Sequence, residues 1–93
     1  MSMDAIADKM RAKVEGSDFT KSVRFDCGPD GVVVINGASV STIDEPADCT
    51  ITLDKDVLES MIAGELDPTS AFMQGKLRVD GDMSVAMALS QVL

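Results

Sequence analysis

Two runs of alternating apolar residues flank one turn signal in the first half of this chain, and this pattern constrains the fold most. Between residues 19 and 27 every second side chain is apolar except at Lys21, and the run ends at Phe25 and Cys27. The Pro-Asp-Gly sequence at residues 29 to 31 favours a tight turn, because proline presets φ and glycine accepts a positive φ. The next run, Val32 to Ile35, is therefore expected to pair with the first as a β-hairpin.

Three further strands are expected along the chain. The Asn-Gly pair at residues 36 and 37 is a second hairpin signal, and it leads into a strand near residues 38 to 43 and then a loop, IDEPAD. Apolar residues alternate with threonines from Cys49 to Leu53, which indicates a fourth strand. Residues 76 to 80 alternate again, with Leu77 and Val79 on one face of a short fifth strand.

Four helices are expected around these strands, from apolar spacing and from capping signals. The first ends at Gly16, and the second lies between Asp54 as N-cap and Gly64 as its stop. Asp67 caps the third, with Pro68 in the first helical position, and residues 81 and 82 precede the fourth. Their apolar residues are Met3, Ile6, Ala7, Met10 and Val14 in the first, Val57, Leu58, Met61 and Ile62 in the second, Ala71, Phe72 and Met73 in the third, and Met83, Val85, Ala86, Met87, Leu89, Val92 and Leu93 in the fourth.

The length and charge of the chain restrict its partners. A chain of 93 residues is expected to form one domain over residues 1–93 with a single core. The formal net charge of −8 repels nucleic acid and anionic lipid surfaces. No apolar run is long enough for a membrane span, and the N-terminus lacks the apolar region of a secretory signal, so a cytoplasmic location without integral membrane association is expected.

Side chains for catalysis or metal binding are sparse. The chain has no histidine, so a Ser–His or Cys–His nucleophile cannot be assembled from it. Cys27 and Cys49 are interpreted as small buried thiols. Asp80 and Asp82 flank a glycine but lack the further oxygen ligands of a calcium loop, so Asp82 is expected to cap the last helix instead. No cofactor and no metal are expected.

Residues 64 to 89 hold fourteen positions with a distinctive order and spacing: Gly64, Leu66, Pro68, Ala71, Phe72, Gly75, Lys76, Leu77, Gly81, Asp82, Met83, Ala86, Met87 and Leu89. In this pattern the chain resembles the sterol carrier protein 2 family of lipid-transfer domains. The resemblance implies an α+β fold in the order α-β-β-β-β-α-α-β-α, with helices packed on one face of a five-stranded, mixed, twisted sheet. It also implies a non-catalytic carrier that holds a fatty acyl chain, acyl-CoA or sterol-like ligand in an apolar tunnel between sheet and helices.

Seven methionines against three aromatic residues indicate an adaptable core, which suits ligands of different shapes. The alternative is that these methionines only fill irregular gaps. The residues expected to line the tunnel are Phe25, Ile51, Leu58, Met61, Ile62, Phe72, Met73, Leu77, Met83 and Met87. The fourth helix is apolar over too wide an arc to rest on water, so it is expected to be sheltered on more than one side.

Two other functions stay open at the level of sequence. A thiol enzyme would use Cys27 or Cys49 with a depressed pKa, although no cation lies nearby in the sequence to cause it. An interaction module would have a solid core, and its fourth helix would dock either a partner protein or a second copy of the chain, which would give a homodimer. Lys76 and Arg78 either meet a carboxylate or CoA phosphate near the mouth of the tunnel, or form a solvated face.

Overall fold

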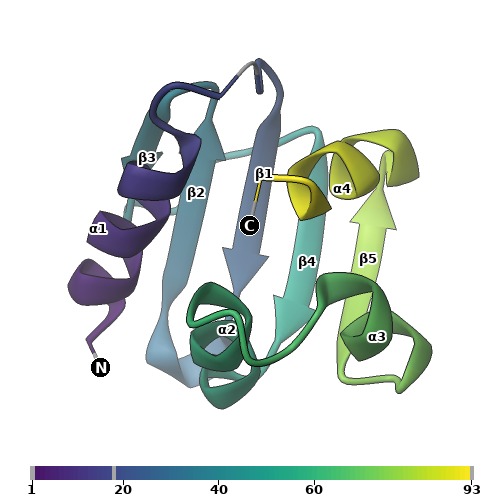
Figure 1. Ribbon diagram of the computed structural model, residues 1–93. Coiled ribbons are helices and arrows are strands. Elements are labelled where there is room, and N and C mark those ends of the chain that lie inside the picture. Colours follow the sequence, from purple (N-terminus) through teal and green to yellow (C-terminus); the bar gives the residue numbers. More distant parts are fainter. Residues whose placement is uncertain (1, 18, 93) are drawn as a thin grey trace.

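The computed structural model describes residues 2–17 and 19–92 (Figure 1). Its elements are helix α1 (Met3–Val14), strand β1 (Ser22–Asp26), the short 3-10 helix η1 (Gly28–Asp30), strands β2 (Val32–Asn36), β3 (Ser39–Ser41) and β4 (Cys49–Leu53), helices α2 (Lys55–Ile62) and α3 (Pro68–Met73), strand β5 (Leu77–Gly81) and helix α4 (Met83–Ser90). Apart from η1, which occupies the expected turn, this is the order that the sequence predicted.

The strands form one mixed sheet in the order β3-β2-β1-β4-β5. Strand β1 pairs antiparallel with β2 and parallel with β4, and the two outer pairs, β2 with β3 and β4 with β5, are antiparallel. After the β1–β2–β3 meander the chain therefore returns across the sheet to place β4 beside β1. The expected α+β fold with a five-stranded mixed sheet is confirmed.

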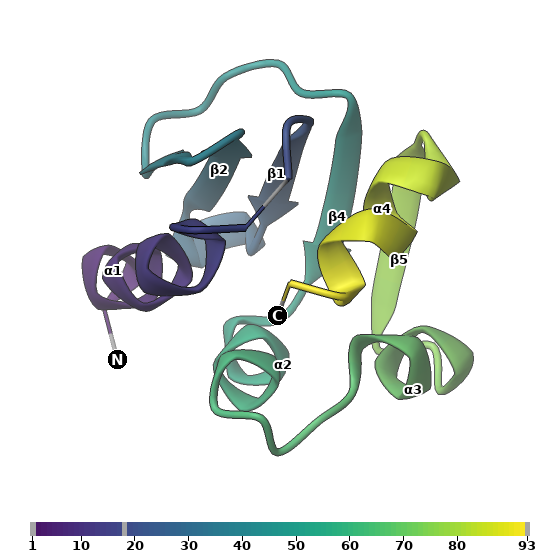
Figure 2. The same cartoon turned by 45° about the horizontal axis from the view of Figure 1, so that its top comes forward.

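Helices cover a single face of this sheet (Figure 2). Helix α1 packs against β2 and β3, whereas α4 packs across β1, β4 and β5. Helices α2 and α3 lie at the end of the sheet where β1 and β4 finish, with α2 against α1 and α3 against β5. The apolar residues of α1 predicted from spacing, including Ile6, Met10 and Val14, are fully buried in the core between helices and sheet.

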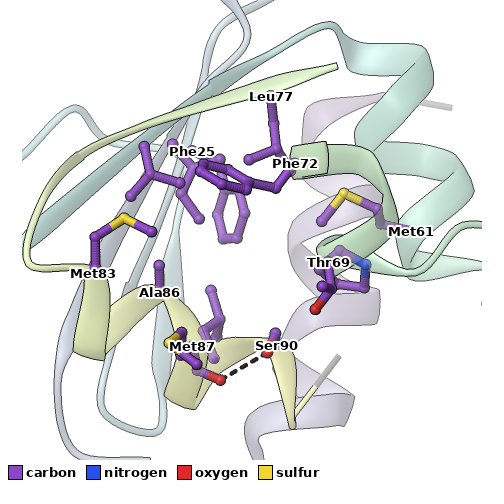
Figure 3. A pocket seen from close by; sticks show the side chains of 13 residues that line it. Phe25, Met61, Thr69, Phe72, Leu77, Met83, Ala86, Met87 and Ser90 are labelled. Carbon is purple, nitrogen blue, oxygen red and sulfur yellow. Dashed lines mark hydrogen bonds between the residues drawn. The ribbon is translucent and has the colours of Figure 1, made fainter. Parts of the chain in front are cut away.

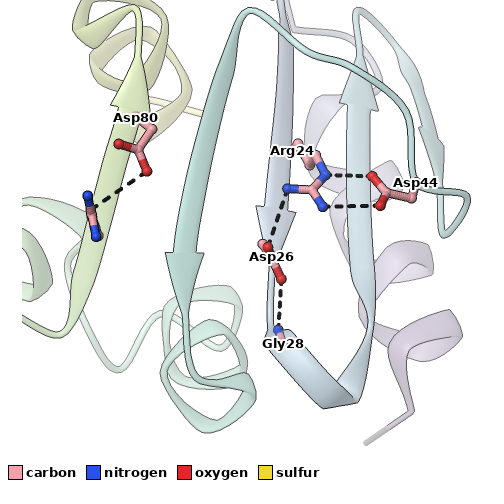
Figure 4. A network of polar contacts seen from close by, with 6 residues as sticks. Arg24, Asp26, Gly28, Asp44 and Asp80 are labelled. Carbon is pink, nitrogen blue, oxygen red and sulfur yellow. Dashed lines mark hydrogen bonds and ion pairs between the residues drawn. The ribbon is translucent and has the colours of Figure 1, made fainter.

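The opposite face of the sheet is polar and carries the returning loop, residues 42–48 (Figure 4). On this face Arg24 donates from Nε to Oδ1 of Asp44 at 2.6 Å and from Nη2 to Oδ2 at 3.1 Å, and its Nη1 lies 3.3 Å from Oδ2 of Asp26. The hydrogen bonds from Arg24 lower the pKa of Asp44. The loop is held a second time where Ser22 donates its N–H and hydroxyl to Oδ2 of Asp48.

Two strands are shorter than the sequence predicted. Strand β1 begins at Ser22, not at residue 19, because its partners end there: β2 reaches Ser22 at Asn36, and β4 begins opposite Val23. Phe19 is nevertheless buried. Strand β3 is shorter than the predicted residues 38 to 43, because the chain leaves the sheet after Ser41 to cross its polar face. Its hairpin turns on Gly37, which has φ of 61°.

Two helix predictions need correction. Asp54 occupies the N-cap position of α2, but its side chain makes no capping hydrogen bond. Helix α4 ends at Ser90, before the predicted Val92, and Leu93 lies outside the described residues. Only Val85 and Leu89 of α4 are buried, so the expected shelter on more than one side of this helix is absent from the described structure. No described helix is long and apolar enough to cross a membrane.

Candidate ligand-binding pocket

A pocket of about 220 Å³ lies between the sheet and helices α3 and α4 (Figure 3). Three adjacent strands, β1, β4 and β5, form its floor, and α2 contributes one side chain at its end. The residues that line it are Phe25, Ile51, Met61, Pro68, Thr69, Phe72, Leu77, Val79, Met83, Ala86, Met87, Leu89 and Ser90.

Strand register builds the floor of the pocket. Phe25 pairs with Ile51 across the parallel β1–β4 ladder, and Ile51 pairs with Val79 across the antiparallel β4–β5 ladder. Paired residues in adjacent strands project from the same face of a sheet. The three side chains therefore form one apolar row that faces the helices, and Leu77 extends it along β5.

Helix α3 forms one wall, and local sequence fixes where it begins and ends. Asp67 accepts a hydrogen bond from the N–H of Thr69 at 2.8 Å, and Pro68 occupies the first turn, where an N–H donor is not needed. Ala71 is fully buried and anchors the helix to the core. This anchoring leaves Phe72 at the edge of the pocket with 46% of its surface exposed.

Helix α4 forms the other wall, and its position depends on a close backbone contact at the end of β5. A Cβ on Gly81 would lie 2.7 Å from the carbonyl oxygen of Asp48, and φ at Gly81 is 103°, so glycine is required there. Asp82 then caps α4 by accepting the N–H of Ser84 at 2.9 Å. Burial of Leu89 turns Ala86 and its neighbours toward the floor.

The lining contains no charged side chain among the described residues. Its only side-chain hydroxyls belong to Thr69 and Ser90, and the Ser90 hydroxyl already donates to the carbonyl oxygen of Met87 at 2.7 Å. Such a surface offers burial of apolar groups and very few hydrogen bonds. Among the described residues, the lining contains no carboxylate, amine, thiol or imidazole.

The rim of the pocket is exposed to solvent. Exposed fractions are 44% for Met83, 65% for Met87 and 80% for Met73, which follows Phe72 on α3. The space is consequently a pocket open along the α3–α4 edge, where the resemblance had implied a tunnel. Helices α3 and α4 flank this opening and are shown on either side of it in Figure 3.

The structure brings together seven of the ten residues expected to line the site: Phe25, Ile51, Met61, Phe72, Leu77, Met83 and Met87. Leu58 and Ile62 are buried in the core, outside the lining, and Met73 is exposed to solvent and does not line the pocket. The sequence prediction missed Pro68, Thr69, Val79, Ala86, Leu89 and Ser90. For Val79, its shared strand face with Leu77 was an available signal.

Both cysteines are buried and form no disulfide, and their environment opposes thiolate formation. Burial, followed by the charges of nearby acidic residues, raises the pKa of Cys27 to about 11. Burial also raises the pKa of Cys49, with smaller effects from Asp82 and Asp80. The described residues contain no group of three His, Cys, Asp or Glu side chains that could hold a metal ion.

A second, more polar pocket of about 320 Å³ lies where β1 and β4 end and β5 begins. Its lining includes Cys27, Asp54, Lys76 and Arg78. The two cations border this pocket and do not line the apolar one, and both are exposed, so of the two predicted alternatives the structure fits the solvated face and not a contact at the mouth of the apolar pocket. Nε of Arg78 also lies 3.7 Å from Oδ2 of Asp80, on the same exposed face of β5 (Figure 4).

Residues 3–93 match the model of the SCP-2 sterol transfer family. Sterol carrier protein 2 from Rattus norvegicus is 35% identical over 92 residues, and the alignment covers 84% of this chain and 17% of that longer protein. The crystal structure of sterol carrier protein 2 like 2 from Aedes aegypti aligns with a TM-score of 0.81 and 20% identity, covering 100% of this chain and 97% of the other. The solution structure of Aedes aegypti sterol carrier protein 2 in complex with palmitate aligns with a TM-score of 0.77 and 22% identity, covering 98% and 94%.

Proposed function

Because this chain belongs to the SCP-2 sterol transfer family, we propose that it is a non-catalytic carrier that holds the apolar chain of a lipid in the pocket between the sheet and helices α3 and α4. The observation that carries the proposal is the pocket itself, which is apolar, uncharged and floored by a continuous row of core side chains. Empty apolar space forfeits packing contacts. A domain of this size has few contacts to spare, so a retained pocket supports a ligand.

The volume favours an acyl chain over a sterol. A pocket of about 220 Å³ holds about seven groups of methylene size, if each takes roughly the ~30 Å³ share of a water molecule. A straight chain can enter by its end and leave the remainder outside. A fused ring system cannot enter in part without leaving most of its apolar surface in water, so sterols are expected to bind more weakly.

The energy of such partial entry is modest. Seven buried methylenes contribute about 6 kcal/mol, which is near the lower end of the ~4–15 kcal/mol that association costs. Tight binding therefore requires further cover for the part of the chain that leaves the pocket. The exposed sides of Phe72, Met83 and Met87 lie where that part would emerge, and they can supply it.

The head group of the ligand is expected to stay in solvent. No charged residue lines the pocket, and an anionic head group buried there would lack a partner. A free acid, an ester and an acyl-CoA of one chain length should therefore bind through the same buried segment. The proposal predicts selection by the length of the chain and little selection by the head group.

Catalysis is not part of the proposed function. Raised thiol pKa values at Cys27 and Cys49 leave both thiols protonated at neutral pH, which removes the basis for a thiol nucleophile. The sequence supplies no histidine as a general base. The carrier role needs only reversible burial of the ligand.

Native mass spectrometry of the protein purified from cells, followed by displacement of a fluorescent fatty acid with saturated acids of increasing length, tests this proposal. Expected results are a co-purifying lipid and an affinity that rises steeply with each carbon until the pocket is full, then more slowly. Replacing each acid by its methyl ester should change little. A ligand-free protein that binds no acyl chain and forms a stable dimer would instead support the interaction module.

A further inference from the structure

Charge is distributed unevenly over this molecule. The chain carries a formal charge of −8, yet α3 (PTSAFM) and α4 (MSVAMALS) contain no charged residue. The two helices lie on opposite sides of the opening of the pocket (Figure 3). The opening of the pocket, where a ligand would enter, is therefore flanked by two helices that carry no charge.

The same region holds four of the five large hydrophobic side chains that the described structure exposes. We define the rim as these four residues, Phe72, Met73, Met83 and Met87, with exposed fractions from 44% to 80%. Exposed apolar clusters of this kind mark interaction surfaces in soluble domains. Phe72, Met83 and Met87 also line the pocket, so this surface and the pocket mouth coincide.

From this arrangement we propose that the rim docks on the surface of a lipid bilayer with no net charge, such as one of phosphatidylcholine. Helices with aromatic and methionine side chains on one face can insert these side chains at the boundary between head groups and acyl chains. In this orientation the pocket opens directly onto the bilayer. A lipid chain can then move between membrane and pocket without crossing water.

Electrostatics selects this occupant over the alternatives. Two copies of the chain, each with a charge of −8, repel one another, so a second copy is disfavoured on this surface. An anionic membrane is repelled for the same reason. A lipid surface without net charge does not repel the uncharged rim. It does not repel the acidic faces of the protein either, because these lie farther from the bilayer and their charges are screened by salt.

Met73 separates this inference from lipid binding in the pocket. Its side chain is 80% exposed and does not line the pocket. Ile43 offers a matched control, because it is 67% exposed and lies in the loop next to Asp44, on the opposite face of the sheet. Met73→Gln and Ile43→Gln each remove one exposed apolar side chain without changing the charge.

The experiment is flotation of the full chain with phosphatidylcholine vesicles, with and without phosphatidylserine, at low and high salt. Wild type is expected to float with neutral vesicles at both salt concentrations, and phosphatidylserine is expected to weaken binding at low salt only. Met73→Gln should lower the partition coefficient between vesicles and solution by about tenfold. Ile43→Gln should match wild type, and both variants should bind a fluorescent fatty acid as wild type does in the absence of vesicles.

Three results would overturn the inference. In the first, wild type binds the fluorescent fatty acid but stays in solution with neutral vesicles. In the second, Met73→Gln and Ile43→Gln lose vesicle binding equally. In the third, sedimentation shows a concentration-dependent dimer that Met73→Gln dissociates. The first result would leave the proposed carrier function intact. Thermal unfolding of each variant verifies that the comparison is between folded proteins.

Discussion

Replacement of Ala86 by tryptophan is expected to abolish binding of a lipid chain while leaving the stability of the fold nearly unchanged. Ala86 lines the pocket from α4 and is only half-buried. Figure 3 shows it between Met83 and Met87 on the helix wall, facing the pocket. The indole adds about nine non-hydrogen atoms to alanine, and the pocket has room for about seven methylene-sized groups. The side chain therefore occupies the space that the ligand needs.

The magnitude follows from the volume of the pocket. Loss of about seven buried methylenes removes up to ~6 kcal/mol of favourable burial, which corresponds to about four powers of ten in Kd. Contacts that the ligand keeps on the rim reduce this loss, so a fall in affinity of at least about a hundredfold is expected. In a filled core the same insertion would cost ~1–3 kcal/mol of stability, whereas in an open pocket the change should stay below ~1 kcal/mol.

The assay combines displacement of a fluorescent fatty acid with urea unfolding. The natural chain has no tryptophan and no tyrosine, so the emission wavelength of the new indole reports its own burial. Ala88→Trp is the matched control, because Ala88 is exposed on the same helix and does not line the pocket. Its emission should resemble that of a solvated indole, and its ligand affinity should equal that of wild type.

Two outcomes would refute the reasoning. If Ala86→Trp binds the fatty acid as tightly as wild type, the pocket is not the binding site. If the free energy of unfolding of Ala86→Trp falls by several kcal/mol relative to Ala88→Trp, the space between α4 and the sheet cannot accept a large side chain. In that case it cannot accept a ligand either.

Three further perturbations probe the scaffold. Gly81→Ala forces a Cβ to within 2.7 Å of the Asp48 carbonyl oxygen at φ of 103°, so it should cost ~2 kcal/mol and lower Tm by about 10 °C in calorimetry; an unchanged Tm would contradict this strain. Alkylation of Cys27 by iodoacetamide should be slow at neutral pH and accelerate toward its pKa of about 11, and rapid reaction at neutral pH would show a different environment. The pKa of Asp44 is lowered by Arg24, so Asp44→Asn should destabilise the fold at neutral pH and converge with wild type as pH falls through that lowered pKa; a difference in urea midpoint that persists in acid would exclude the ion pair as its source.

Most of the elements were predictable because their signals are local. Alternation around Phe25 and Ile51, and the glycines in the turns, concern residues only a few positions apart. The ends of strands were less predictable because pairing sets them. Strand β1 begins at Ser22 because β2 pairs with β1 from that residue and β4 only from Val23, and neither strand pairs with earlier residues.

The candidate site was predictable in part, and the misses have a common cause. Met61 lines the pocket, whereas Leu58 and Ile62, on the same apolar side of α2, are buried in the core. Spacing identifies the apolar side of a helix but not which of its residues meets a neighbouring helix and which meets a cavity. On α3, likewise, two adjacent residues have different environments: Phe72 lines the pocket, whereas Met73 is exposed to solvent.

The sequence by itself determined the strands, the turns, the caps at Asp67 and Asp82 and the absence of charge on α3 and α4, since each depends on residue type and short-range spacing. Only the tertiary structure decided that Phe25, Ile51 and Val79 form one row, because their alignment comes from pairing between strands distant in the sequence. The same long-range contacts hold α4 across the sheet and leave a space beneath it. Whether an apolar side chain fills the core, lines a pocket or meets solvent is a property of that arrangement, because burial depends on what lies opposite.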